Sequence, residues 1–131
     1  MYTDLVIDHF TNPRNVGIME DPDGYGKVDS PVCGDMMELY IKVEDGVIAD
    51  VKYRTFGCAA AIASSSMATE MIKGKPLSCV TQLSDESVAA QLGGLPDVKI
   101  HCSVLAASAL HAALEDYYSK HPEARPVEQT A

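Results

Sequence analysis

The sequence predicts a small α+β domain, in which helices pack mainly on one face of a three-stranded antiparallel sheet. Two observations support this prediction: neighbouring segments alternate apolar and polar residues around a tight turn, and the segments after them have helical composition and stop signals. Of the 131 residues, 47% are hydrophobic and 22% are charged, as in an ordinary single soluble domain. We expect that domain at 1–120 and a flexible tail at 121–131, which has two prolines and no periodicity.

The clearest pattern is a predicted β-hairpin. Apolar and polar residues alternate from about 37 to 43, Glu-Asp-Gly supplies a turn at 44–46, and the alternation resumes from 47 to 55. Before the hairpin, a turn-rich stretch leads to an additional edge strand near Gly26–Asp29, which is the first of the three strands in chain order. Each strand of the hairpin should therefore have one buried face and one wetter face.

The remaining segments are expected to be helical. The longest runs are rich in helix formers, lack proline and carry capping or stop residues at their ends. In chain order, the expected helices are 3–10 with Thr3 as its cap, 59–73 stopped by Gly74, two short turns at 76–80 and 84–92, the second capped by Ser84, and 105–118. The small residues Ser64-Ser65-Ser66 should let the second helix lie close to the sheet.

Charge and hydropathy exclude two kinds of partner. The formal net charge of -9 repels phosphate backbones, so we expect no nucleic acid and instead proteins with a basic surface. No apolar run approaches the roughly 18 residues that span a bilayer, so we expect no membrane insertion. The first residues carry an early acid and no export pattern, which predicts a cytoplasmic protein or a matured organellar chain with reduced cysteines.

Three of the four cysteines lie at the predicted ends of elements. Cys33 precedes the second strand, Cys58 follows the third strand, and Cys102 stands just before the last helix. Because antiparallel neighbours bring the start of one strand beside the end of the other, Cys33 and Cys58 should meet at one end of the sheet. His101 and Cys102 join them if the last helix points its N-terminus to that end.

Such a cluster would suit a metal. Three thiolates with Asp35 or His101 supply the four ligands that zinc or an iron–sulfur cluster requires, and both candidates for the fourth position stay open. Helix N-termini and lysines such as Lys99 favour the metal-binding thiolate form of cysteine. A single oxygen or nitrogen ligand among sulfurs should make a cluster easier to release.

Three functions compete for these residues. The first is a cluster scaffold, and the second is a zinc-binding structural or interaction module with the same ligands. The third is a thiol enzyme with Cys102 as nucleophile and His101 as base, although adjacent residues usually point apart. A simpler interpretation makes the cysteines buried core thiols, Asp35 a turn residue and His101 a loop-orienting residue. His9, His111 and His121 are expected on the surface or on helix faces.

The chain resembles the IscU/NifU-type iron–sulfur cluster assembly scaffolds over nearly all of residues 1–120. Several blocks in the same order and spacing carry this resemblance, which makes it highly specific. The blocks are Asp8-His9-Phe10, Asn12-Pro13-Arg14-Asn15-Val16-Gly17, Pro31-Val32-Cys33-Gly34-Asp35, Thr55-Phe56-Gly57-Cys58, Ala61-Ile62-Ala63-Ser64-Ser65-Ser66 and Lys99-Ile100-His101-Cys102-Ser103.

The resemblance implies an IscU/SufE-like fold and a scaffold or carrier, not an enzyme. Such a scaffold receives persulfide sulfur from a cysteine desulfurase, assembles a labile [2Fe–2S] cluster with iron, and transfers it to acceptor apoproteins. When no cluster is present, members bind zinc or iron at the same ligands. A homo-oligomer, in the simplest case a homodimer, is compatible with this role.

By the same resemblance, the cluster or metal ligands are three thiolates and two candidates for the fourth position: Cys33, Cys58, Cys102, Asp35 and His101. Cys102 would also accept the persulfide, Asp35 would tune cluster release, and Lys99 would lie beside the site.

Two features depart from the family pattern. Members usually carry Leu-Pro-Pro-Val-Lys, which a dedicated Hsp70-type chaperone binds, whereas this chain has Leu95-Pro96-Asp97-Val98-Lys99. The added carboxylate counts against that partner. Cys79 matches no family ligand, so we expect a packing residue in a short helix; the rival hypothesis makes it a ligand shared across a dimer.

Overall fold

The computed structural model describes residues 3–29, 34–80, 83–94 and 100–122, with the backbone alone for Asp85 and residues 100–103. Its elements, in chain order, are α1 (Asp4–Thr11), β1 (Gly24–Asp29), β2 (Met36–Glu44), β3 (Val47–Phe56), α2 (Ala59–Ile72), α3 (Leu77–Val80), α4 (Asp85–Gln91) and α5 (Ile100–Lys120). Within these ranges, no helix is long and apolar enough to cross a membrane. Of the tail expected at 121–131, residues 123–131 lie outside them.

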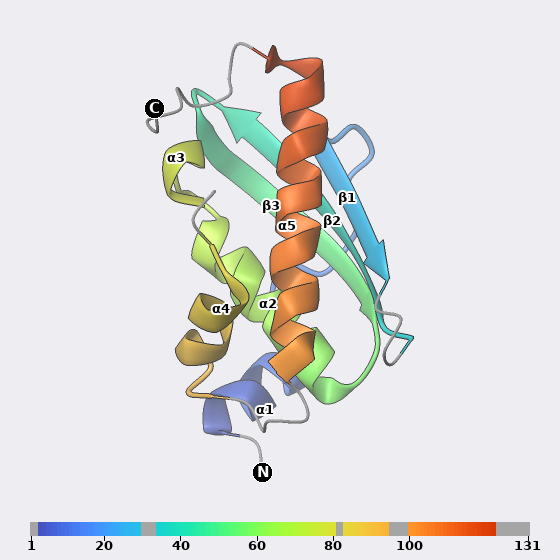
Figure 1. Cartoon of the computed structure of the whole chain (residues 1–131), viewed down its shortest axis with the longest axis vertical. Helices are drawn as coiled ribbons and strands as arrows, with labels where there is room; N and C mark the ends of the chain where they lie inside the picture. The colour runs from blue at the N-terminus through green and yellow to red at the C-terminus, as the bar shows by residue number, and fades with distance from the viewer. Residues whose placement is uncertain (1–2, 30–33, 81–82, 95–99, 123–131) are drawn as a thin grey trace.

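The three strands form one antiparallel sheet in the order β1-β2-β3, and α2 and α5 cover the same face of it (Figure 1). The predicted fold class is therefore confirmed. Buried side chains of the strands, such as Leu39, Ile41 and Val51, share one core with the apolar residues of the helices. Burying this apolar face provides the main favourable term in folding.

The turn between β2 and β3 sets the register of the hairpin. Asp45 and Gly46 have positive φ angles of 54° and 75°, as a tight reversal requires. Pairing then runs to Met36 opposite Phe56, with an irregularity between Lys42 and Val43. The residues just before β2 and just after β3 consequently lie at the same end of the sheet.

The direction of α5 follows from its close packing on β1. A Cβ added at Gly26 would lie 2.5 Å from the Ala113 nitrogen and 2.6 Å from the Ala109 oxygen, and one added at Gly24 would lie 2.5 Å from the Ala113 oxygen. The helix therefore runs opposite to β1, with lower residue numbers toward Asp29 (Figure 1).

Simple lengths locate the first turn of α5. Cys102 precedes Ala109 by seven residues, about 10 Å of helix. Asp29 follows Gly26 by three residues, about 10 Å of strand. Asp29 pairs with Met36, so the backbone at Cys102 is level with the start of β2. The sequence left the direction of the last helix open, and the structure turns its N-terminus toward the end of the sheet that carries Asp35.

One helix boundary was wrong. The last helix was expected from 105, but it begins at Ile100, so His101 and Cys102 lie in its first turn and not in a preceding loop. Histidine, cysteine, serine and valine are weak helix formers, so the local sequence from 101 to 104 carries little helical signal. The packing of α5 along β1 stabilises this first turn, which the intrinsic helix propensity of its residues does not.

The predicted caps are confirmed. The Thr3 hydroxyl accepts a hydrogen bond from the Val6 amide, and Ser84 forms a reciprocal capping box with Ser87. After α2, Gly74 adopts a φ of +81°, which suits a glycine that stops a helix. The two caps define where α1 and α4 begin, and Gly74 defines where α2 ends.

His9 was expected on the surface or on a helix face, and it lies on the buried face of α1. Its side chain lies between α1 and α2 with a residue exposure of 5%, and its Nδ1 atom is 2.7 Å from the Ser66 hydroxyl. The Arg14 amide donates to the same hydroxyl at 3.0 Å. Burial lowers the pKa of His9, and the Arg14 charge acts in the same direction, whereas Asp8 and Glu70 oppose it.

Acidification should therefore weaken the fold through His9. Its pKa is lower in the folded protein than the ordinary 6.5, so near and below that pH the unfolded chain binds more protons. The stabilisation is complete above about pH 6.5 and is lost as the pH falls through the folded pKa. In urea denaturation between about pH 7.5 and 5.5, His9→Gln should show a shallower pH dependence than wild type. If the stability of the two proteins depended equally on pH, His9 would not be the origin of the effect.

Candidate functional site

Asp35 and Cys58 meet at the end of the sheet where β2 begins and β3 ends. Asp35 directly precedes β2, and Cys58 is the N-cap residue of α2. The Cys58 Sγ atom lies 3.9 Å from Asp35 Oδ2. The Asp35 residue is only 6% exposed, whereas Cys58 is partly exposed. A buried carboxylate thus lies beside a thiol that solvent can reach.

Hydrogen bonds fix the start of α2 against β3. The Thr55 hydroxyl donates to the Ser65 hydroxyl at 2.8 Å, and Ser65 donates to the Ala61 carbonyl at 2.8 Å. All three residues of the Ser64-Ser65-Ser66 run are fully buried, which agrees with their predicted role in close packing. These hydrogen bonds join α2 to the end of β3 on either side of Cys58.

The chemistry of this pair fits a metal ion. Thiolate and carboxylate are both ligands of zinc, and thiolates bind iron–sulfur clusters. A tetrahedral zinc ion, with bonds of about 2.3 Å to sulfur and about 2.0 Å to oxygen, would hold these two atoms about 3.5 Å apart. The observed 3.9 Å is within a small side-chain movement of that value. The N-terminus of α2, where the Cys58 side chain makes no capping bond, favours negative charge nearby.

The other predicted site residues are described only in part or not at all. Cys33 and Lys99 lie outside the described residues, as does the rest of the Leu95–Lys99 motif. For His101 and Cys102 the backbone is described, in the first turn of α5 at the same end of the sheet as Asp35. In the part of the chain whose side chains are described, no three His, Cys, Asp or Glu side chains gather into a metal site.

Gly57, which precedes Cys58, was not among the predicted site residues. A Cβ atom built on it would lie 2.6 Å from the carboxyl carbon of Asp35. A glycine between a strand end and a candidate ligand is a signal of close approach, and it was available in the sequence.

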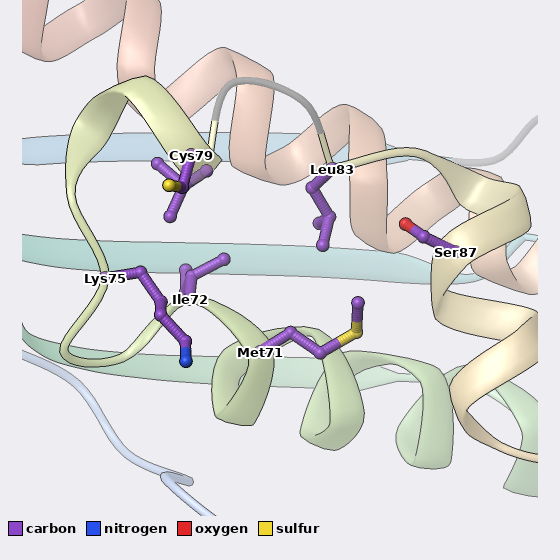
Figure 2. A pocket seen from close by; sticks show the side chains of 7 residues that line it. Met71, Ile72, Lys75, Cys79, Leu83 and Ser87 are labelled. Atoms are coloured by element: carbon purple, nitrogen blue, oxygen red, sulfur yellow. The ribbon is translucent and has the colours of Figure 1, made fainter.

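Cys79 lies at the opposite end of the sheet. It belongs to α3, as expected, and α3 follows a bridge between Pro76 and Val47 beside the hairpin turn. The residue is exposed, so the expectation of a packing residue was wrong. Its side chain borders an open cavity of about 400 Å³ (Figure 2), which is also lined by residues of α2, α3 and α4 and of the segments between them, namely Met71, Ile72, Lys75, Val80, Leu83 and Ser87.

Comparison with known proteins gives a consistent result. A model of the NifU-like N terminal domain family matches residues 1–124. The protein named iron-sulfur cluster assembly scaffold protein IscU 1 from Archaeoglobus fulgidus is 60% identical over 121 residues, which cover 92% of this chain and 79% of that protein. The iron-sulfur cluster assembly scaffold protein IscU from Azotobacter vinelandii is 54% identical over 123 residues, covering 91% and 95%.

A solved structure supports the fold. The N-terminal part of a nitrogen-fixing NifU-like protein from Brucella abortus superimposes with a TM-score of 0.72, covering 90% of this chain and 94% of that one. The sequence identity is 21%, so this likeness concerns the fold alone. It agrees with the three-stranded α+β architecture described above.

Proposed function

Because the chain belongs to the NifU-like N-terminal domain family, we propose that it is a scaffold for iron–sulfur cluster assembly. In this proposal residues 1–120 form the scaffold domain, and the protein is a carrier and not an enzyme. The cluster is its cargo: a labile [2Fe–2S] cluster, assembled from iron and sulfur and passed to acceptor apoproteins. The observation that carries the proposal is the contact of 3.9 Å between Cys58 Sγ and Asp35 Oδ2 at the start of α2.

The proposed ligands are the three cysteine thiolates and one further donor, namely Cys33, Cys58, Cys102, and Asp35 or His101. A mixed donor set suits a cargo that must leave, because a carboxylate or imidazole is less firmly bound to iron than a fourth thiolate. The short distance from Asp35 to Cys58 favours the carboxylate as the fourth ligand. Zinc or iron would bind the same donors before the cluster forms.

The proposed sulfur source is the persulfide of a cysteine desulfurase. The Cys102 thiolate attacks the outer sulfur of that persulfide, a new S–S bond forms on Cys102, and the desulfurase thiolate leaves. Two electrons from a separate reductant then release the sulfur as sulfide, and the Cys102 thiolate is regenerated. Lys99 would stabilise the negative charge of the thiolate or carboxylate nearby.

The proposed partners follow from charge and sequence. A chain of net charge -9 should associate with basic surfaces on the desulfurase and on the acceptors. An Hsp70-type chaperone is a weaker candidate because Asp97 replaces the second proline of the family motif. We keep the cytoplasmic location and the homodimer as parts of this proposal.

Anaerobic reconstitution tests the proposed function. The full chain is incubated with ferrous iron, cysteine, a cysteine desulfurase and a thiol reductant, and iron, sulfide and visible absorption are measured. We expect two irons and two sulfides for each cluster, with sulfide-to-iron absorption that disappears when an acceptor apoprotein takes up the cluster. Tight binding of one zinc per chain without any cluster would instead favour the zinc-binding module.

A further inference from the structure

Gly57 leaves space for the Asp35 carboxyl group. The three atoms nearest to a Cβ built on Gly57 all belong to that group: Cγ at 2.6 Å, Oδ1 at 2.7 Å and Oδ2 at 3.0 Å. Real Cβ atoms essentially never approach another heavy atom within 3.0 Å. A side chain at position 57 would therefore displace the carboxyl group from its observed position.

Backbone conformation does not explain this glycine. Gly57 is not among the residues with a positive φ angle, so an alanine could adopt its backbone geometry. Gly34 and Gly46 differ in both respects, because they have φ angles of +76° and +75° and no atom within 4 Å of an added Cβ. Space for Asp35 is what distinguishes Gly57.

The position of the carboxyl group matters because Oδ2 faces Cys58 Sγ at 3.9 Å. Ordinary van der Waals contact with a Cβ begins near 3.4 Å, so the carboxyl carbon would have to move by about 1 Å. Asp35 is 6% exposed, so its neighbours restrict where it can go. A displacement of this size is enough to spoil a shared metal site.

We propose that Gly57 is a positioning residue: its missing Cβ lets the Asp35 carboxylate lie against the backbone beside Cys58, where both side chains can bind one metal ion. This inference rests on the proposed function, since it takes Asp35 as a ligand. Gly57 has no atom that could bind the metal, yet in this proposal it determines how tightly the metal is bound.

The test compares wild type with Gly57→Ala, Asp35→Ala and the double variant, each as the full chain under anaerobic conditions. Cobalt(II) alone is the probe, because its thiolate bands report binding at cysteine. Gly57→Ala should weaken cobalt binding by about tenfold or more, as Asp35→Ala should. The double variant should bind no more weakly than Asp35→Ala, because the atoms that meet the new methyl group are gone.

Thermal unfolding of the metal-free proteins gives a second readout. Gly57→Ala should lower Tm in the wild-type background and have no effect in the Asp35→Ala background. Gly46→Ala, at the hairpin turn, is the matched control: its positive φ should lower Tm while cobalt affinity stays unchanged.

Two outcomes would overturn the inference alone: unchanged cobalt affinity in Gly57→Ala while Asp35→Ala loses affinity, or an equal loss from Gly57→Ala in both backgrounds. Wild-type affinity in Asp35→Ala would instead overturn the ligand role of Asp35 in the proposed function, and the inference with it.

Discussion

Replacing Gly26 by alanine should lower the free energy of unfolding by about 3 kcal/mol and Tm by about 10 °C. The new methyl group would lie 2.5 Å from the Ala113 nitrogen and 2.6 Å from the Ala109 oxygen. Both are backbone atoms inside α5, so no rotamer change can relieve the clash. Either the helix moves away from β1 and opens gaps in the core, or the strand distorts.

Urea denaturation followed by circular dichroism measures this loss. Lys27→Ala is the matched control, since Lys27 is the next residue of β1 and is exposed. That control should stay within about 0.5 kcal/mol of wild type. If Gly26→Ala were as stable as Lys27→Ala, the close docking of α5 on β1 would be wrong, and so would the position inferred for the first turn of α5.

Cys58→Ser should abolish the cluster, with at least about a tenfold loss of bound iron after reconstitution. Serine has almost the same shape, so the partly buried position at the start of α2 should remain packed. Its hydroxyl group, however, stays protonated at neutral pH and is a far poorer ligand than a thiolate. Iron and sulfide analysis and visible absorption measure the difference.

Cys79→Ser provides the matched control for this cysteine substitution. Cys79 is exposed in α3 at the hairpin-turn end of the sheet, away from Asp35. This variant should bind as much iron and sulfide as wild type. A cluster retained by Cys58→Ser would contradict the proposed ligand set. A cluster lost in Cys79→Ser would also contradict it and would favour the alternative in which Cys79 is shared between subunits.

The contact between Asp35 and Cys58 could be anticipated from the sequence because it depends on a local hairpin. Alternating residues define the two strands, and the Glu-Asp-Gly turn at 44–46 fixes their register. Once the register is set, the residues before β2 and after β3 must be neighbours. No knowledge of distant packing is needed for that step.

The first turn of α5, by contrast, depends on tertiary packing. Weak helix formers at 101–104 hid the helix start, and the direction of docking depends on contacts made by Gly24 and Gly26. Likewise, the burial of His9 depends on how α1 lies against Ser66 of α2. Helix amphipathicity alone cannot indicate which polar residue a neighbouring helix will cover.

The role of Gly57 could not be predicted from the sequence for a different reason. Its sequence position next to Cys58 was part of a motif, yet a missing side chain acquires a meaning only when the neighbour that occupies its space is known. That neighbour, Asp35, precedes it by 22 residues along the chain. The motif therefore indicated that the segment matters without indicating what the glycine does.

The most direct test of the proposed site is anomalous scattering at the iron absorption edge from anaerobic crystals of the reconstituted full chain. We predict an iron peak within bonding distance of Cys58 Sγ, with the Asp35 carboxylate or the His101 imidazole among the ligands and Cys33 and Cys102 completing the set. Iron bound elsewhere, for example beside Cys79, with none near Cys58, would contradict the account.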